Sequence, residues 1–338
     1  MIASLSTRDR LDVEVLEALY AARGSLTPFQ LARQLSREEA DVGGSLHRLR
    51  GAGCVFDEHP QHGLRLVEAG LGMWRLRLAR ELALPETAVH VYRRTSSTQD
   101  RAREDVERGG QSSPRLVIAD EQSAGRGRLG RRWQAPPGSS LLLTLAVPLP
   151  AARRRGVEPI TAYAAVALLE AIERVTGVQP ALKWPNDVVH DGRKVAGILV
   201  ERVDAPPGSF ALIGIGVNVN HPEPAPLENA SPLAHDGQSS PRLRPAWLSD
   251  AIGRRLDRLP LLTEIVRQAL RWSRRPDRDA ALHRWRRSCT TLGQHHRFVS
   301  NGREIAGDVL DVDLDEGLIL RRDTGELLHL PAASTTVL

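Results

Sequence analysis

The sequence has 338 residues, 41% of them hydrophobic, with a formal net charge of +5 and a pI near 9.8. This length accommodates two or three domains, and no apolar run approaches the roughly 20 residues of a membrane span. Two cysteines exclude a disulfide framework, and the first residues lack the layout of a signal peptide, so a cytoplasmic protein is expected. The net positive charge favours anionic partners such as nucleotides, nucleic acid or an acidic protein.

Residues 1–75 are predicted to form a small helical domain that ends in a β-hairpin. Apolar residues at helical spacing indicate three helices, and Thr27-Pro28 has the form of an N-cap followed by proline at the first helical position. The third helix is expected over 38–50, and two short strands over 55–67 follow it. Three helices and a hairpin are typical of a winged helix-turn-helix domain. A helical linker is expected over 76–90.

Residues 91–287 alternate predicted strands and helices and are assigned to a single central domain. The runs 116–119 and 141–147 are apolar enough for central strands of a sheet. A strong helix is expected over 161–175, because its apolar residues form one buried stripe. The segment 247–287 is expected to be helical and carries many arginines.

Three strands in a meander are predicted over residues 181–219. The first is expected to run over 181–190, and Asp191-Gly192 is a favoured two-residue turn into the second. This arrangement places Lys194 just after the hairpin tip and Lys183 on the partner strand.

The last part of the chain changes character. Residues 220–245 are rich in proline, serine and glycine and are predicted to be a loop. Short strands about ten residues apart over 288–338 indicate a small β-barrel. The arginines of 271–287 and the pair His295-His296 have no partner at a recognisable spacing and are interpreted as solvated surface.

Lysine is almost absent from this chain. Only two of the 46 basic residues are lysine, Lys183 and Lys194. A lysine ammonium reaches a single point, whereas the arginine guanidinium presents a flat fork of donors. The two exceptions therefore mark positions where a compact ammonium is expected to be needed.

A glycine- and arginine-rich loop is the second candidate for chemistry. Gly125–Gly130 matches the dinucleotide fingerprint G-x-G-x-x-G, but the residues up to Gly138 cannot open a helix, so no helix N-terminus receives a pyrophosphate. Glycines instead allow close approach to a ligand, and Arg126, Arg128 and Arg131 offer forked donors to phosphate or carboxylate. The alternative is a solvated basic loop.

Several blocks of the sequence resemble the signature blocks of biotin–protein ligases, and they occur in the order of that family. They are Thr95–Gln99, Gln122, Gly125–Trp133, Lys183–Val188, Lys194–Glu201 and Gly214–Asn220. The resemblance covers nearly the whole chain. It implies a multidomain α+β protein with an N-terminal winged helix-turn-helix, a central class II synthetase-like mixed sheet with helices, and an SH3-like C-terminal β-barrel over residues 288–338.

The implied activity is ATP-dependent biotin–protein ligation through biotinyl-5′-AMP, with transfer to a lysine of the biotin carboxyl carrier protein of acetyl-CoA carboxylase. The implied catalytic residues are Lys194, Arg126 and Arg128. The implied biotin-binding residues are Ser97, Thr98, Gln99, Gln122, Arg126, Gly127, Arg128, Lys194, Gly197 and Gly214. The implied ATP-binding residues are Arg128, Arg131, Trp133, Lys183, Asn186, Asp187 and Asn218. The substrates are ATP and biotin, and Asp187 is the candidate contact for Mg²⁺.

Some of these residues also have structural interpretations. Lys183 is alternatively a salt-bridge partner, and Trp133 or Trp184 is alternatively a core aromatic residue. The family also implies a homodimer formed through the central sheet, and no membrane contact is expected.

The family members with a winged helix also repress biotin genes, so a DNA operator is an expected partner. The candidate DNA contacts are Arg37, Ser45, His47 and Arg48. Acidic residues at the start of the third helix repel phosphate, and Gly43-Gly44 removes side chains and costs roughly 1 kcal/mol of helix stability per glycine. The alternative is a winged helix that serves only packing or dimerisation.

Two other functions remain open from sequence. One is a lipoate ligase-like acyl transferase, against which the Gly125–Trp133 block and the C-terminal strands argue. The other is a DNA-binding regulator that senses biotinyl-AMP and has lost transfer activity, against which the intact Lys194, Arg126 and Arg128 argue.

Overall fold

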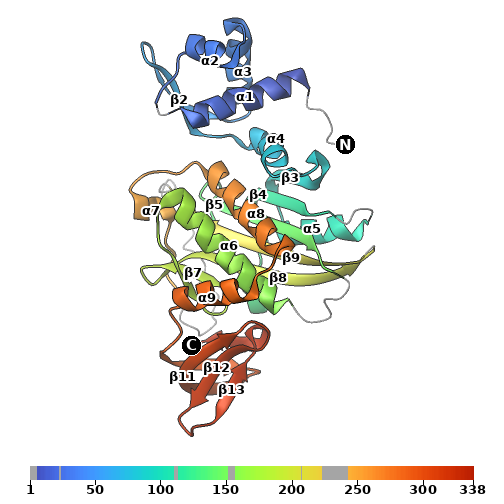
Figure 1. Ribbon diagram of the computed structural model, residues 1–338, viewed down its shortest axis with the longest axis vertical. Helices are drawn as coiled ribbons and strands as arrows, with labels where there is room; N and C mark the ends of the chain where they lie inside the picture. Colours follow the sequence, from blue (N-terminus) through green and yellow to red (C-terminus); the bar gives the residue numbers. More distant parts are fainter. Residues whose placement is uncertain (1–5, 23, 110–112, 151–156, 207, 223–242) are drawn as a thin grey trace.

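The computed structural model describes residues 6–22, 24–109, 113–150, 157–206, 208–222 and 243–338. The chain forms three regions stacked along its long axis, a helical N-terminal region, a central sheet covered by helices, and a C-terminal sheet (Figure 1). None of the helices in these ranges is long and apolar enough to cross a membrane.

The N-terminal region contains the three predicted helices and the predicted hairpin. Its elements are α1 (Thr7–Ala21), α2 (Pro28–Leu35), α3 (Glu39–Gly51), β1 (Val55–His59) and β2 (Gly63–Glu68). Thr27 caps α2 as predicted, because its side chain accepts from the Gln30 backbone N–H while the Gln30 side chain accepts from the Thr27 N–H. Fully buried Val13, Leu16 and Leu31 form the centre of this region.

The segment predicted as a linker is part of the packed structure. Helix α4 (Leu71–Glu81) is followed by a short 3₁₀ turn, η1 (Glu86–Ala88), and strand β3 (Val89–Thr95) begins inside the predicted linker. Trp74 and Leu78 of α4 are almost completely buried. The helical character of this segment is as predicted, and the apolar face of α4 also joins the core.

The central region is a mixed seven-stranded sheet in the order β3-β4-β5-β9-β8-β7-β6. Strands β3 and β4 pair in parallel, and the remaining neighbours pair in antiparallel orientation. The further strands are β4 (Arg115–Gln122), β5 (Ser140–Pro148), β6 (Ala181–Lys183), β7 (Asp187–His190), β8 (Arg193–Ala205) and β9 (Gly208–Asn218). The apolar runs predicted as central strands are β4 and β5.

The predicted strand over 181–190 is two strands. Lys183 at the end of β6 lies opposite Asp187 at the start of β7, so the chain turns back at Trp184–Asn186. Pro185 has no N–H to donate to a ladder, which ends the first strand. Lys183 is therefore not on the strand beside Lys194, and the prediction on this point was wrong. The turn at Asp191-Gly192 is as predicted, with φ of 48° and 70°.

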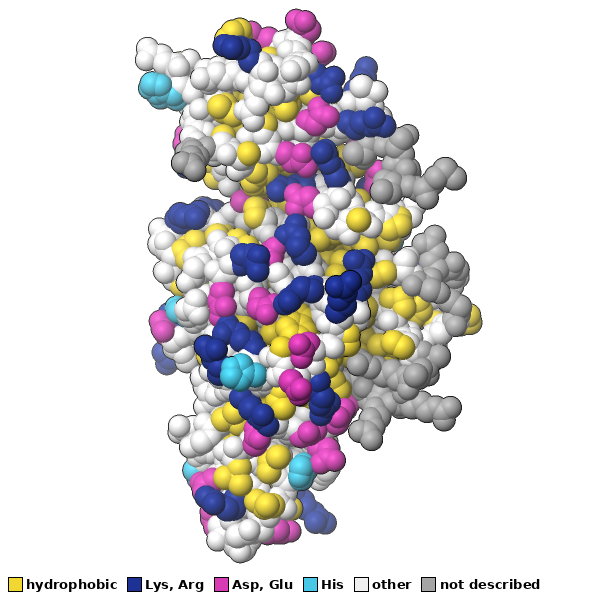
Figure 2. Space-filling view, viewed as in Figure 1, with side chains coloured by type: hydrophobic (Ala, Val, Ile, Leu, Met, Phe, Trp, Pro, Cys, Tyr) yellow, Lys and Arg dark blue, Asp and Glu magenta, His cyan; other side chains and the backbone are white. Residues whose placement is uncertain are grey.

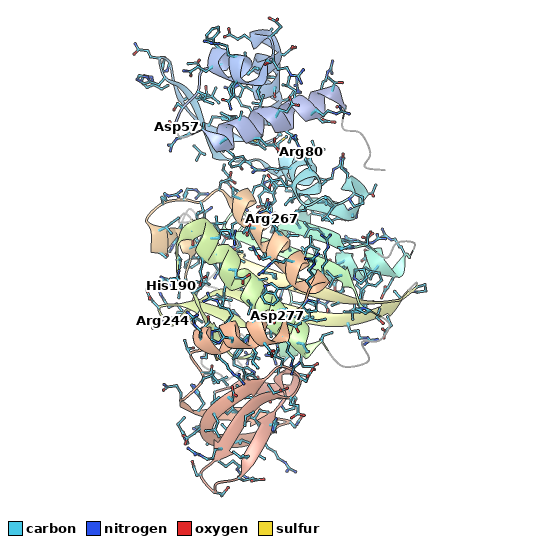
Figure 3. The ribbon with its side chains drawn as sticks, viewed as in Figure 1. Asp57, Arg80, His190, Arg244, Arg267 and Asp277 are labelled. Carbon is cyan, nitrogen blue, oxygen red and sulfur yellow. The ribbon has the colours of Figure 1, made fainter. Side chains whose placement is uncertain are left out.

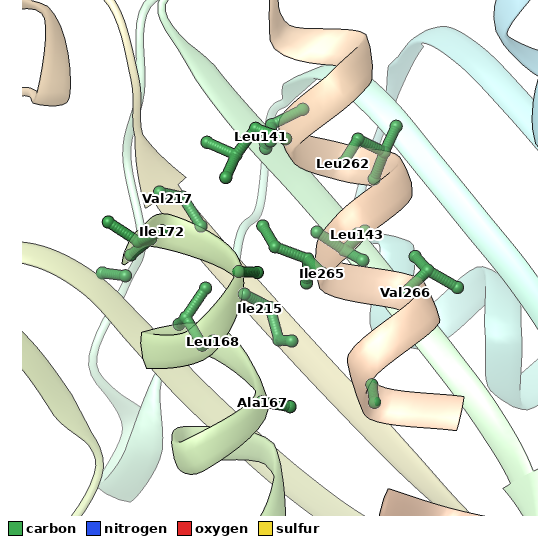
Figure 4. Packing of buried hydrophobic residues seen from close by; sticks show 14 of the residues in the cluster. Leu141, Leu143, Ala167, Leu168, Ile172, Ile215, Val217, Leu262, Ile265 and Val266 are labelled. Carbon is green, nitrogen blue, oxygen red and sulfur yellow. The ribbon is translucent and has the colours of Figure 1, made fainter. Parts of the chain in front are cut away.

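Both faces of the central sheet are covered. Helices α6 (Glu158–Thr176) and α8 (Arg258–Arg274) pack on one face, where Leu168 and Ile265 meet Leu143 and Ile215 of the central strands (Figure 4). Helix α5 (Thr98–Glu107) covers the other face through Ala102 and Val106. Strands buried on both faces are expected to be continuously apolar, as β5 is.

The C-terminal region is an antiparallel five-stranded sheet in the order β13-β12-β11-β10-β14. Its strands are β10 (His295–Ser300), β11 (Arg303–Asp313), β12 (Gly317–Arg322), β13 (Leu327–Leu330) and β14 (Thr335–Val337), with η3 (Ala332–Ser334) before the last. Helices α7 (Leu248–Ile252) and α9 (Arg278–Ser288) lie between the central strands and this sheet in sequence. Most of the loop predicted over 220–245, residues 223–242, lies outside the described residues.

The arginines of 271–287 are paired more often than the sequence indicated. Arg284 forms an ion pair with Glu173 of α6, and Arg286 forms one with Asp311 of β11 at 2.6 Å. Basic and acidic side chains are accordingly interspersed on the face shown in Figure 2. Arg267, labelled in Figure 3, reaches from α8 to Glu81 of α4 at 3.3 Å. All of these arginines except Arg284 are exposed, as the interpretation as solvated surface expects. The sequence did not reveal their acidic partners, because those partners are distant along the chain.

Candidate active site

A buried polar cluster lies where α5 meets β4 and β5. Ser97 is the N-cap of α5 and is 1% exposed, and Gln122 ends β4. The Gln122 side-chain oxygen accepts from the Thr98 N–H at 2.7 Å and lies 3.1 Å from the Thr98 hydroxyl. Thr144 of β5 lies 2.9 Å from the Thr98 hydroxyl and 3.0 Å from the Gln99 amide oxygen. The structure therefore brings together four of the predicted biotin-binding residues.

Glycines on β8 and β9 form the floor beside this cluster. A Cβ at Gly214 would lie 2.6 Å from the Gln99 amide oxygen, and one at Gly216 would lie 2.5 Å from the Trp133 indole. A Cβ at Gly197 would meet the same indole at 3.0 Å and the Lys194 ammonium nitrogen at 3.1 Å. A Cβ would clash with these side chains at Gly214 and Gly216 and would crowd them at Gly197, so the three glycines let the side chains lie directly on the backbone.

The loop Gly125–Trp133 closes on itself as a small hairpin. The Gly127 N–H donates to the Arg131 carbonyl at 2.7 Å, and the Trp133 N–H donates to the Gly125 carbonyl at 3.0 Å. A Cβ at Gly125 would lie 2.4 Å from the Trp133 carbonyl oxygen, which explains the first glycine. The loop contains only the short turn η2 (Arg128–Gly130) and opens no helix, as predicted from its sequence.

The two arginines predicted to act as a clamp have different partners. Arg126 lies 2.8 Å from Asp100 of α5 and 3.1 Å from Glu201 of β8. Arg128 donates to the Asn186 side-chain oxygen at 3.2 Å and to backbone carbonyls of the C-terminal region. Burial lowers the pKa of Arg128 to about 10, against the opposing effect of the Asp187 carboxylate. The loop is thus held at one end by α5 and at the other by the C-terminal region.

Lys194 lies at the centre of these elements. Its ammonium lies 2.6 Å from the Asp187 carboxylate and 5.3 Å from the centre of the Trp133 indole ring. The main chain is fixed as well, since the Asn218 side-chain amide donates to the Lys194 carbonyl at 3.2 Å. Its side chain is 27% exposed, so the ammonium is oriented yet reachable.

The other predicted nucleotide contacts are distributed around Lys194. Asn186 and Asp187 lie on the turn and strand beside it, whereas Arg131 is exposed on the loop. Within the described residues Lys183 has no ion-pair partner within 4.0 Å, so the salt-bridge interpretation receives no support. Lys183 and burial together lower the pKa of His296, with burial the larger cause.

Two site residues were missed from sequence. Thr144 is the one hydroxyl in the apolar run of β5, and that interruption was the available signal. Gly216 lies in a recognised block, but only the structure places it under the Trp133 indole. Trp133 is only partly buried, so it is not simply a core aromatic, and its buried indole N–H has no hydrogen-bond partner among the described residues. Trp184, by contrast, is 3% exposed and belongs to the core.

The candidate DNA-binding residues on α3 and just before it are largely engaged within the N-terminal region. Ser45 is fully buried and its hydroxyl donates to Asp12 at 2.7 Å, so it is removed from the surface expected to face DNA. Arg48 is bound to the same carboxylate at 2.7 Å, and Arg37 lies 3.1 Å from Glu14. His47 is exposed.

No group of three or more potential metal ligands among His, Cys, Asp and Glu occurs within the ranges that the structure covers. Cys54 and Cys289 are buried free thiols, and burial raises the pKa of both.

Comparison with known proteins identifies relatives over most of the chain. Residues 91–220 match the Biotin/lipoate A/B protein ligase family. The bifunctional ligase/repressor BirA of Bacillus spizizenii is 26% identical over 328 residues, covering 93% of this chain and 94% of that protein. The biotin–[acetyl-CoA-carboxylase] ligase of Paracoccus denitrificans is 31% identical over 233 residues, covering 66% of this chain and 90% of that protein.

Solved structures show the same fold. The biotin protein ligase of Aquifex aeolicus in complex with biotin and ATP superposes with a TM-score of 0.57 at 23% identity, covering 74% of this chain and 98% of that chain.

Proposed function

The chain belongs to the biotin–protein ligases of the Biotin/lipoate A/B protein ligase family, and we propose that it is an ATP-dependent ligase. It activates biotin as biotinyl-5′-AMP and transfers the biotinyl group to a lysine of the biotin carboxyl carrier protein of acetyl-CoA carboxylase. The observation that carries this proposal is the position of Lys194, whose ammonium lies over the indole of Trp133 and beside Gly197.

Biotin is assigned to the glycine floor between the polar cluster and Lys194. The cluster residues Ser97, Thr98, Gln99 and Gln122 suit the ureido ring, which both donates and accepts hydrogen bonds. Gln122 already accepts from Thr98, so its amide N–H groups remain for a carbonyl oxygen. Gly197, Gly214 and Gly127 allow the ring and valeryl chain to lie close to the main chain.

Lys194 stabilises the first chemical step. A biotin carboxylate oxygen attacks the α-phosphorus of ATP, an O–P bond forms, and diphosphate leaves with the electrons of the broken P–O bond. Two anions approach each other in this step, so a cation aimed at the developing charge lowers the barrier. The ion pair with Asp187 orients the ammonium before the ligand takes its place.

The second step transfers the acyl group. The neutral amine of the acceptor lysine attacks the carbonyl carbon of the mixed anhydride, AMP leaves, and the amine loses a proton. Arg126 and Arg128 hold the loop over the anhydride and exclude water, which limits hydrolysis. The planar fork of Arg128 also suits the phosphate, and it has to leave Asn186 or the carbonyls of Ala332 and Thr335 to bind it.

The nucleotide is assigned to the side of Lys194 away from the polar cluster. Trp133 gives a surface for adenine, and Arg131, Lys183, Asn186 and Asn218 line the path of the phosphates. The carboxylate of Asp187 suits Mg²⁺, which binds proteins through one or two carboxylates together with substrate phosphates. When bound, Mg²⁺ neutralises charge on the triphosphate.

We propose a finer architecture, which membership of the family supports. The N-terminal region is assigned as a winged helix-turn-helix, the central sheet as class II synthetase-like and the C-terminal sheet as an SH3-like barrel, in a cytoplasmic homodimer. The name bifunctional ligase/repressor of a relative favours operator binding as a second function. Arg37, His47 and Arg48 are the remaining candidate contacts, and Arg48 has to leave Asp12 to reach a phosphate.

Biotin-dependent exchange of labelled diphosphate into ATP tests the activation step, with lipoate as the competing acid. Exchange with biotin and none with lipoate is expected, whereas exchange with lipoate alone would establish the acyl transferase alternative. A gel-shift with the chain's own biotin-gene promoter, with biotin and ATP present, tests the second function. Absence of a shift would mean that the chain acts only as a ligase and does not bind this operator.

A further inference from the structure

A buried arginine joins the N-terminal region to the central strands. Arg258 is the first residue of α8, and its side chain is 7% exposed. Its Nε donates to Glu68 at 3.0 Å, and its Nη1 donates to Asp120 at 2.6 Å and to the Ser140 carbonyl at 3.2 Å. It lies outside residues 91–220 and outside every motif that the sequence revealed.

The two carboxylates come from different regions of the chain. Glu68 ends β2 of the N-terminal region, whereas Asp120 lies on β4, two residues before Gln122. The Glu68 and Asp120 side chains are 19% and 15% exposed. Charges removed from water in this way depend strongly on their partners, so loss of one partner disturbs the others.

The bond between Arg258 and Asp120 connects Arg258 to the segment beside the Gly125–Trp133 loop. The same Asp120 oxygen that binds Arg258 also accepts from the Gly138 N–H at 3.2 Å. Gly138 lies between Trp133 and the start of β5. Gln122 is on the same strand as Asp120, two residues further along. Asp120 therefore connects Arg258 to Gly138, which follows the Gly125–Trp133 loop, and to the strand that ends at Gln122, the residue that binds Thr98.

The bond between Arg258 and the Ser140 carbonyl connects Arg258 to Lys194 through Asn218. Ser140, whose carbonyl accepts from Arg258, lies opposite Asn218 in the β5–β9 ladder. The Asn218 side chain donates to the Lys194 carbonyl. A second contact ties the residues after β9 to the residues before α8. The Leu256 N–H donates to the Asn220 side chain at 2.8 Å, and the Asn220 side-chain amide donates to the Leu256 carbonyl at 3.0 Å.

We propose that Arg258 is a positioning residue of the biotin site and that its bond to Glu68 makes biotin affinity depend on the N-terminal region. Arg258 acts through Asp120 and Ser140 and touches no ligand. The inference rests on the proposed biotin ligase function, and it adds a specific route by which a region outside the catalytic sheet controls ligand binding.

The variant Glu68→Gln in the full chain tests this route, because it removes the charge on the N-terminal side and leaves Arg258 bound to Asp120. We expect biotin binding, measured by calorimetry, to weaken about tenfold. In diphosphate exchange the KM for biotin should rise while kcat stays within about twofold. The matched control is Glu58→Gln, since Glu58 pairs with Arg50 inside the N-terminal region.

Arg258→Gln should weaken biotin binding more than Glu68→Gln, and Arg258→Lys should recover part of the loss. The control on the same helix is Arg271→Gln, which breaks an exposed pair with Glu170. If Arg258→Gln does not fold, Glu68→Gln decides the matter alone. Biotin affinity equal to wild type in Glu68→Gln would overturn the inference. A wild-type chain that neither binds biotin nor exchanges diphosphate would instead overturn the proposed function.

Discussion

The central sheet is joined to its two neighbours in different ways. Toward the N-terminal region the contacts are buried, because Tyr20 donates its hydroxyl to Asp257 and Arg258 is enclosed by carboxylates. Toward the C-terminal region they include exposed ion pairs such as Arg286 with Asp311. Exposed pairs contribute little, whereas a buried polar group that loses its partner costs much more. Loss of a buried polar partner at the N-terminal junction should therefore cost more stability than loss of an exposed ion pair at the C-terminal one.

Buried contacts also occur at the C-terminal junction. The rings of Trp184 and Phe298 pack with centroids 6.1 Å apart, and the Trp184 N–H donates to the Thr291 hydroxyl at 3.2 Å. Arg128 runs from the ligand loop to the carbonyls of Ala332 and Thr335, and it is held by Asn186 on the way. This contact connects the C-terminal region to the candidate site through a single, mostly buried guanidinium. Four substitutions distinguish the contributions of the two junctions, and they are given from the largest expected effect to the smallest.

Asp257→Ala should lower the free energy of unfolding by about 3 kcal/mol, because the Tyr20 hydroxyl and the N–H groups of Ala69 and Leu259 lose their acceptor. Urea denaturation of the full chain measures this change. Asp311→Ala on the other junction is the matched control. Equal losses for the two variants would remove the distinction between the junctions.

Arg128→Ala should weaken biotin binding and shorten the retention of biotinyl-AMP by about tenfold or more, because the loop loses its hold on the C-terminal region. Release of the adenylate from the preloaded enzyme is the measurement. Arg303→Ala, an exposed change on β11, serves as the control. Unchanged biotin affinity together with unchanged retention would contradict the role given to Arg128.

Tyr20→Phe should change how stability depends on pH in the alkaline range. Burial, and then the Asp257 charge, raise the pKa of Tyr20 above 10.0 in the folded state. Above that pH the unfolded chain loses the phenol proton while the folded chain keeps it, so wild-type stability falls as pH rises. Denaturation between about pH 9 and 11 should give a shallower decline for Tyr20→Phe. Parallel declines would show that the phenol is not held neutral.

Arg286→Ala should lower the free energy of unfolding by less than about 1 kcal/mol, and added salt should reduce the difference from wild type. Its partner Asp311 remains partly exposed, so solvent replaces the lost contact. Urea denaturation at low and high salt provides the test. A loss as large as that of Asp257→Ala would show that the exposed pairs hold the C-terminal region in place.

Local signals predicted much of the fold. Thr27 caps the start of α2, and both residues of the Asp191-Gly192 turn have positive φ. The apolar run of β5 forms a strand buried on both faces. The candidate site was likewise found where its residues are close in sequence, as in the loop ending at Trp133. These features depend on neighbouring residues, so the chain order alone reveals them.

Long-range contacts could not be predicted in this way. Arg258 meets Glu68 across 190 positions and Asp120 across 138, and no periodicity marks such pairs. The sequence predicts that Ser45 faces DNA, whereas in the structure its hydroxyl binds Asp12 of another helix. The sequence predicts Lys183 on the strand beside Lys194, because no local signal shows that the chain reverses before Asp187.

The central claim is that this chain transfers biotin with Lys194 as the stabilising cation. Its most direct test is transfer of biotin to a carrier domain with ATP and Mg²⁺, by wild type and by Lys194→Ala. The account predicts transfer by the wild type and a loss of about 100-fold or more in the variant. Near-normal diphosphate release and transfer by Lys194→Ala would contradict it.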